Sequence, residues 1–127
     1  MDGPRRILVI DDSALIRHVV QAGLRGEPGW HVDAAESGPR GVELATSARP
    51  DLILLDVEMP DPDGPATLAL LREREVTREV PVLFLTGHSA DEDRRTLLAL
   101  GAAGVIAKPF DPPALAAEIR RQMEWAQ

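Results

Sequence analysis

The sequence has no cysteine, few aromatic residues and only one lysine among its basic side chains. Without cysteine, disulfide bonds and thiolate metal sites are excluded. No apolar run approaches the length of a membrane-spanning helix, and the first residues lack the apolar core of a signal peptide behind them. We therefore expect a cytoplasmic protein with no membrane partner.

The charge balance argues against nucleic acid as a partner. The chain has a formal net charge of −7, and aromatic residues make up 3% of it. Nucleic-acid binding needs a basic surface that neutralises phosphates, and single strands need aromatic platforms for base stacking. The chain also lacks the GxxxxGK[ST] loop that binds nucleotide phosphates. Partners other than DNA, RNA or nucleotides are therefore expected.

The order of the apolar segments indicates an α/β fold. At 127 residues the chain suits one domain, 1–127, and is too short for two. Continuous apolar runs at 7–10, 52–55 and 82–85 are typical of parallel strands covered on both faces, and 30–35 and 104–107 are weaker strand candidates. Segments with helical spacing alternate with these strands. The pattern predicts a single doubly wound (βα)5 sandwich, flavodoxin-like, with a parallel five-stranded sheet of order 2-1-3-4-5.

Capping residues predict where several helices begin and end. Ser37 and Asp111 each stand shortly before a proline, and Ser89 stands three residues before Glu92 in a capping box. Each of these residues predicts a helix start. Glycine after the last helical residue is typical of a helix end, which we expect at Gly26 and Gly101.

Polar residues stand at the ends of four predicted strands: Asp11 and Asp12, then Asp56, Thr86 and Lys108. In open α/β sheets, ligands bind outside the carboxyl ends of the strands, where the strand order reverses. For the order 2-1-3-4-5 this point lies between the first and third strands, so the three aspartates should meet there. Three carboxylates in one crevice require a hard divalent cation, and Mg²⁺ is the usual solution.

This set of groups matches the needs of phosphoryl transfer. A divalent cation and an ammonium neutralise phosphoryl oxygens while an in-line nucleophile attacks. Aspartate is able to act as that nucleophile and form an aspartyl phosphate. Asp56 is best placed because it stands alone at the tip of a central strand. Lys108 is the single lysine beside thirteen arginines, which favours a specific role for its compact charge over a solvated surface position.

Four stretches resemble the receiver domain of two-component response regulators: "VIDDSALIR", "DLILLDVEMPDPDG", "VLFLTG" and "GAAGVIAKPF". Each motif alone is weak, but the ordered set at the strand ends is strong, and the resemblance covers essentially the whole chain. It implies a chemotaxis-regulator-like phosphoacceptor, which catalyses only its own phosphorylation and dephosphorylation. It also implies a histidine kinase or phosphotransfer protein as phosphodonor, and a downstream protein target that the sequence does not name.

The resemblance assigns the metal ligands. It implies that Asp56 is the phosphoacceptor and that Asp12, Asp56 and the backbone carbonyl of Glu58 bind Mg²⁺. Asp11 is implied to contact the ion through water. The alternative for Asp11 alone is a helix N-cap, a common role for aspartate, but that role leaves Asp12 unexplained.

The resemblance also assigns the groups around the phosphoryl oxygens. Thr86 and Lys108 are implied to bind these oxygens, and the Lys108–Pro109 peptide is expected to be cis. Glu58 and His88, two residues beyond Asp56 and Thr86 respectively, are expected to face each other across the mouth of the site. There they would tune the loss of phosphate by obstructing the attacking water.

Two departures from the family pattern concern signalling and assembly. Val105 stands three residues before Lys108, where an aromatic switch residue is usual, so a ring movement is unavailable. The stretch "GAAGV" lacks the two acids of the transcription-factor branch, and we expect a monomer or weak dimer. The chain stops about where the fifth helix should end, so we expect no attached output domain, although an excised fragment remains an alternative.

Two other functions fit part of this pattern. Haloacid-dehalogenase-type phosphatases also combine aspartyl phosphate, Mg²⁺, threonine and lysine, but their nucleophile lies on the first strand in an Asp-x-Asp motif. Here the first strand ends in adjacent acids, Asp11 and Asp12. A pseudo-receiver, which binds partners without phosphate, is the second alternative, and the complete set of acids, threonine and lysine argues against it.

Overall fold

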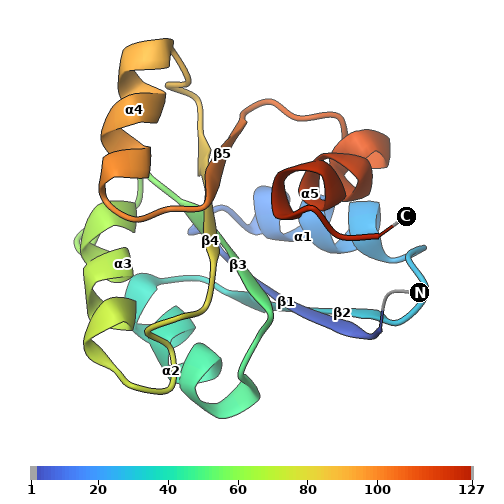
Figure 1. The fold of residues 1–127 in the computed structure, drawn as a ribbon, viewed down its shortest axis with the longest axis horizontal. Coiled ribbons are helices and arrows are strands. Elements are labelled where there is room, and N and C mark those ends of the chain that lie inside the picture. Colours follow the sequence, from blue (N-terminus) through green and yellow to red (C-terminus); the bar gives the residue numbers. More distant parts are fainter. Residues whose placement is uncertain (1–2, 127) are drawn as a thin grey trace.

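The computed structural model describes residues 3–126, in which five strands alternate with five α-helices (Figure 1). The strands are β1 (Arg5–Ile10), β2 (Trp30–Ala35), β3 (Leu52–Asp56), β4 (Val82–Thr86) and β5 (Gly104–Ala107). The helices are α1 (Ala14–Leu24), α2 (Gly38–Ala48), α3 (Gly64–Glu73), α4 (Asp91–Ala99) and α5 (Leu115–Met123), with a 3-10 turn, η1 (Pro112–Ala114), before α5. All strand pairs are parallel in the order β2-β1-β3-β4-β5, which confirms the predicted topology.

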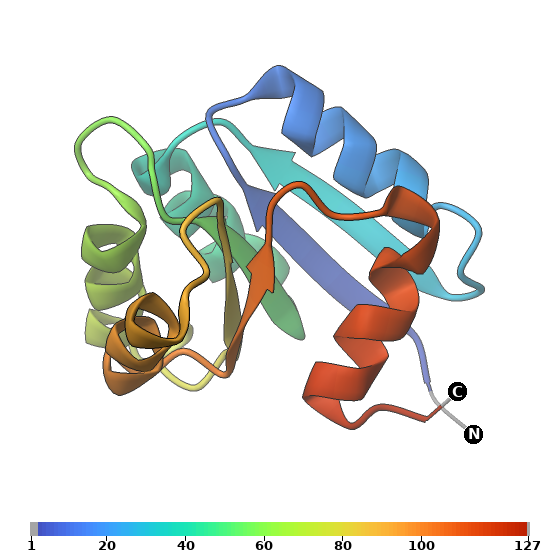
Figure 2. The same ribbon diagram turned by 90° about the horizontal axis from the view of Figure 1, so that it is seen from above.

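The sheet is covered on both faces. Helices α1 and α5 lie on one face, and α2, α3 and α4 lie on the other (Figures 1 and 2). Alternate residues of β1 enter the two cores: Ile7 and Val9 pack toward α1 and α5, while Leu8 and Ile10 pack toward the other three helices. The continuous apolar runs follow from this arrangement, because a strand buried on both faces has no side that favours polar residues.

Most helix boundaries lie where the capping residues predict them. The Ser37 hydroxyl accepts a hydrogen bond from the Arg40 amide, 3.2 Å away, at the start of α2. Gly26 follows the C-cap of α1, and Gly101 adopts a φ of 106° just beyond α4, which is the left-handed conformation that glycine tolerates.

The prediction that Ser89 begins the fourth helix is wrong. Helix α4 begins at Asp91, and its N-cap is Ala90, which makes no side-chain cap hydrogen bond. Three acidic residues occupy the first turn instead, and their charges interact favourably with the amino-terminal end of the helix dipole. The helix start predicted at Asp111 is partly confirmed: Asp111 is the N-cap of η1, but its side chain makes no cap hydrogen bond, and α5 itself starts at Leu115.

Within residues 3–126, none of the helices has the length and apolar character that crossing a membrane requires.

Candidate functional site

The predicted site residues come together at the carboxyl edge of the sheet, toward which the strand arrows point (Figure 2). Asp56 ends β3 and Thr86 ends β4, and both side chains are buried. Asp11 directly follows β1, where its amide donates to the Ala35 carbonyl. The Lys108 amide donates to the Thr86 carbonyl at 2.8 Å, which fixes the end of β5 against β4. The parallel ladders therefore place these residues side by side.

Lys108 connects two buried carboxylates. Its Nζ lies 3.0 Å from Asp11 Oδ2 and 2.9 Å from Asp56 Oδ1. The Lys108 side chain is only 20% exposed, so the interpretation of Lys108 as a solvated surface charge is wrong. The alternative role of Asp11 as a helix N-cap is also wrong. Ser13 caps α1, and Asp11 Oδ1 accepts from the Ser13 amide.

At both Asp56 and Lys108, burial shifts the pKa in one direction and the hydrogen bond between the two residues shifts it in the other. Burial raises the pKa of Asp56 above its ordinary value and the Asp11 carboxylate raises it further, while the hydrogen bond from Lys108 partly opposes this rise. Burial lowers the pKa of Lys108, but its bonds to Asp56 and Asp11 outweigh burial and raise it overall. Lys108 therefore stays charged, and Asp56 carries a carboxylate whose charge is not fully compensated.

A third carboxylate, Asp12, completes an acidic cluster. One oxygen from each of Asp11, Asp12 and Asp56 lies within 4.8 Å of the others, with Asp12 on the exposed side. Three carboxylates and one ammonium give −3 + 1, a formal charge of −2. Oxygen donors with this charge suit a hard divalent cation such as Mg²⁺, so the residues present fit the predicted metal.

Thr86, Glu58 and His88 form a second hydrogen-bonded group beside the acids. The Thr86 hydroxyl donates to Glu58 Oε1 at 3.0 Å and accepts from the His88 amide at 2.9 Å. His88 Nε2 lies 3.1 Å from Glu58 Oε2. The predicted meeting of Glu58 and His88 is confirmed. The bond between Thr86 and Glu58 was missed, although β3 and β4 are neighbours and residues just beyond their ends must lie close together.

A glycine shapes the loop that follows Asp56. The amide of Gly64 donates to the Val57 carbonyl at 2.9 Å, which folds the loop back on β3. A Cβ at position 64 would lie 2.4 Å from the Asp56 carbonyl oxygen and 2.7 Å from Val57 Cα. Because the neighbouring atoms are backbone, only glycine allows α3 to start this close to the phosphoacceptor candidate.

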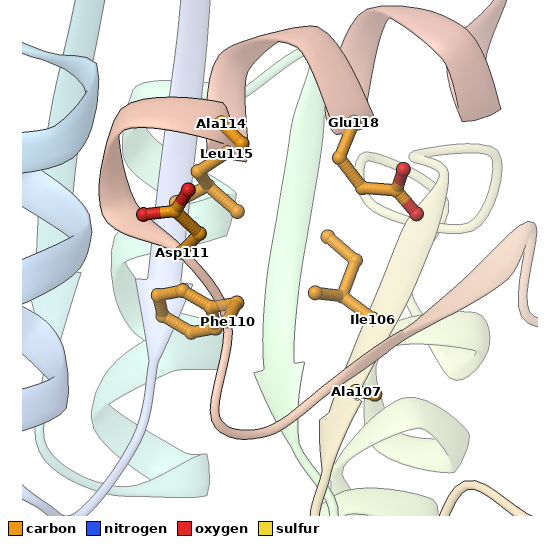
Figure 3. A pocket seen from close by; sticks show the side chains of 7 residues that line it. All are labelled: Ile106, Ala107, Phe110, Asp111, Ala114, Leu115 and Glu118. Carbon is orange, nitrogen blue, oxygen red and sulfur yellow. The ribbon is translucent and has the colours of Figure 1, made fainter.

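Three further features lie around the site. The Lys108–Pro109 peptide is cis, as the resemblance implies. Val105 is 1% exposed in the core beside α4. A cavity of about 250 Å³ lies between β5 and α5, where apolar side chains such as Phe110 and Leu115 face it (Figure 3). Asp11, Asp12, Asp56 and Thr86 do not line this cavity, so the cavity is separate from the candidate site.

The comparisons with known proteins agree with this geometry. Residues 7–120 match the family model described as "Response regulator receiver domain". The phosphate regulon transcriptional regulatory protein PhoB of Klebsiella pneumoniae is 40% identical over 119 residues, which are 94% of this chain and 52% of that protein. The transcriptional regulatory protein TrcR of Mycobacterium tuberculosis is 36% identical over 92% of this chain and 44% of its own length. The chain thus spans about half the length of these curated relatives.

A solved structure matches this chain over nearly its full length. The chemotaxis response regulator CheY4 of Vibrio cholerae superposes with a TM-score of 0.85 at 32% identity, over 94% of this chain and 99% of that one. In the present chain the first strand ends in adjacent acids and the isolated aspartate lies on β3, unlike the Asp-x-Asp arrangement of the phosphatase alternative. The chain belongs to the receiver domain family of response regulators.

Proposed function

We propose that this receiver domain accepts a phosphoryl group on Asp56 in a two-component system or phosphorelay. The observation that carries the proposal is the buried Asp56 carboxylate at the tip of β3, bonded to Lys108 within a cluster of three acids. In the reaction an Asp56 oxygen forms a bond to phosphorus. The bond between phosphorus and the donor imidazole nitrogen breaks, and the imidazole leaves with the electron pair.

The acids would hold the metal that this reaction uses. Asp12, Asp56 and the Glu58 carbonyl are the proposed Mg²⁺ ligands, and Asp11 acts through water. When bound, the ion supplies positive charge that neutralises the phosphoryl oxygens. Lys108 and Asp56 already pair within hydrogen-bond distance, so the ammonium is positioned to move from the carboxylate to a phosphoryl oxygen. Thr86, at the end of β4, supplies a hydroxyl donor on the other side.

The partners follow from the same chemistry. A histidine kinase or phosphotransfer protein would supply the phosphohistidine, and a downstream protein would read the changed surface. Matching relatives include transcriptional regulatory proteins and a protein-glutamate methylesterase of Archaeoglobus fulgidus, of which this domain covers 36%. Receiver domains thus serve different outputs, and the target is not fixed by the domain. We further propose that 1–127 acts as one cytoplasmic receiver, as a monomer or weak dimer.

Incubation with a small acyl phosphate and Mg²⁺, followed by intact mass measurement, tests this function. We expect a gain of one phosphoryl group that requires Mg²⁺ and is absent in Asp56→Asn. Full labelling of Asp56→Asn would overturn the assignment of Asp56. A wild-type chain that stays unlabelled, also with a phosphohistidine donor, would favour the pseudo-receiver alternative.

A further inference from the structure

The Thr86 hydroxyl already uses its single hydrogen. A hydroxyl donates one hydrogen bond and accepts up to two. Thr86 Oγ1 donates to Glu58 Oε1 at 3.0 Å and accepts from the His88 amide at 2.9 Å. Its other nearby acceptor, the His88 carbonyl, lies at 3.5 Å, which is too long for a strong bond. The carboxylate of Glu58 is therefore the acceptor that orients this hydroxyl.

We propose that Glu58 is a positioning residue that competes with the phosphoryl group for the Thr86 hydrogen. This inference rests on the proposed function, in which Thr86 donates to a phosphoryl oxygen. One hydrogen cannot serve both acceptors fully, so the Thr86–Glu58 bond must break when the phosphoryl bond forms. The side chain of Glu58 thus raises the free energy of the phosphorylated arrangement relative to the resting one.

The second oxygen of Glu58 is held from the opposite side. Its Oε2 lies 3.1 Å from His88 Nε2, so one carboxylate connects the hydroxyl of β4 to the loop that follows it. The His88 and Glu58 side chains are 73% and 49% exposed. A contact between two exposed side chains contributes little stability, so the contact of Glu58 with His88 can break at small cost.

Repulsion between negative charges would break the contact between Glu58 and Thr86. Glu58 Oε1 lies 3.0 Å from the Thr86 hydroxyl oxygen, so a phosphoryl group on Asp56 that accepts from this hydroxyl would place new negative charge beside the Glu58 carboxylate. Like charges in a partly buried site repel each other. The phosphoryl group would therefore both repel the Glu58 carboxylate and replace it as the acceptor of the Thr86 hydrogen.

There is space for Thr86 to reorient. A cavity of about 140 Å³ lies between the end of β4 and α4, and Thr86, His88, Thr96 and Leu97 are among its lining residues. Threonine has staggered χ1 positions that differ in where they place the hydroxyl. The cavity gives the hydroxyl space for this change.

A double-mutant cycle tests the competition. Trifluoroberyllate, a tetrahedral phosphoryl analogue, is titrated with Mg²⁺ into wild type, Glu58→Ala, Thr86→Val and the double variant, and NMR reports half-saturation. These substitutions leave the Glu58 backbone carbonyl in place. Removing the Glu58 charge favours an anion equally in both backgrounds, whereas the competition exists only with the hydroxyl. We expect Glu58→Ala to lower the half-saturating concentration about fivefold more in the wild-type background than in the Thr86→Val background.

Matched variants separate hydroxyl competition from charge and folding. Glu36→Gln removes an exposed carboxylate that shares a cavity with Asp12, and its effect should be equal with and without Thr86→Val. Thr86→Ser keeps the hydroxyl and should restore the coupling to Glu58. Should Glu58→Ala not fold, Glu58→Gln replaces it. Its neutral acceptor is weaker than a carboxylate, so the coupling should shrink but keep its sign.

The outcomes distinguish this inference from the function on which it rests. Equal fold-changes for Glu58→Ala in both backgrounds, with wild type binding the analogue normally, would overturn the competition and leave the proposed function intact. A wild-type chain that neither binds the analogue nor becomes phosphorylated on Asp56 would overturn both.

Discussion

The ammonium of Lys108 lies 2.9 Å from the carboxylate of Asp56, although 52 residues separate them in the chain. The same ammonium reaches Asp11 at 3.0 Å. Two buried acids are thus held by one cation, and the third acid, Asp12, faces solvent beside them. This arrangement leaves negative charge that a divalent cation would neutralise.

Removal of the Lys108 charge should destabilise the fold. Lys108→Met leaves Asp11 and Asp56 buried without their shared cation. Breaking such a pair lowers the free energy of unfolding by about 3 kcal/mol, and saturating Mg²⁺ should restore part of it. Urea unfolding with and without Mg²⁺ measures both effects. A variant as stable as wild type in the absence of metal would show that the contacts of Lys108 with Asp11 and Asp56 do not stabilise the fold.

Lys108 should also be protected by a phosphoryl analogue. It is the single lysine of the sequence, so amine acylation can modify this side chain and the amino terminus alone. We expect the acylation of Lys108 to slow when analogue and Mg²⁺ are bound, while the terminal amine reacts unchanged as an internal control. Lys108→Arg should fold but respond poorly, because a planar guanidinium does not replace a point charge. Unchanged acylation would argue that the ammonium does not contact the analogue.

Asp56→Asn should stabilise the metal-free protein near neutral pH. Because the pKa of Asp56 is raised in the folded state, its ionised form opposes folding, and stability falls as pH rises from the ordinary value of 3.8 through the raised pKa. The advantage of Asp56→Asn should therefore vanish below about pH 3.8. Thermal unfolding of both proteins across this range is the measurement. A variant less stable than wild type at neutral pH contradicts the prediction.

Gly64→Ala should disturb the site through the backbone. Its Cβ would lie 2.4 Å from the Asp56 carbonyl oxygen, so α3 or the end of β3 must shift. Overpacking of this kind lowers the free energy of unfolding by about 2 kcal/mol, and we expect weaker Mg²⁺ binding as well. Gly26→Ala is the matched control, because no atom lies within 4 Å of its added Cβ. Equal behaviour of the two variants would remove the argument for close approach.

Phosphorylation should change the conformation of the loop after β4 and leave the region around Val105 unchanged. Val105 is 1% exposed and β-branched, with no ring to move, whereas Thr86 has a hydroxyl whose bonding changes. Amide shifts on binding of the analogue should concentrate in residues 87–91. Large amide shifts centred on Val105, with unchanged shifts in residues 87–91, would contradict this prediction.

Sequence patterns predict the fold and the position of the site, but not all of the contacts within the site. Buried runs such as 52–55 mark strands covered on both faces, and the strand order then places Asp11, Asp56 and Lys108 at one edge. The contact of Glu58 with Thr86 depends on how two loops turn beyond their strands, which apolar periodicity does not encode. The capping-box pattern at Ser89 predicts the start of α4 wrongly, because the helix begins at Asp91 with three acids in its first turn and no side-chain cap.

The central claim is that Asp56 receives the phosphoryl group, and locating that group by residue tests it most directly. Borohydride reduces an aspartyl phosphate to homoserine, and peptide mass spectrometry then identifies the modified position. After incubation with a phosphodonor and Mg²⁺, we expect homoserine at position 56 and unmodified aspartate at 11 and 12. Homoserine at Asp11 or Asp12 with an unmodified Asp56 would contradict the account.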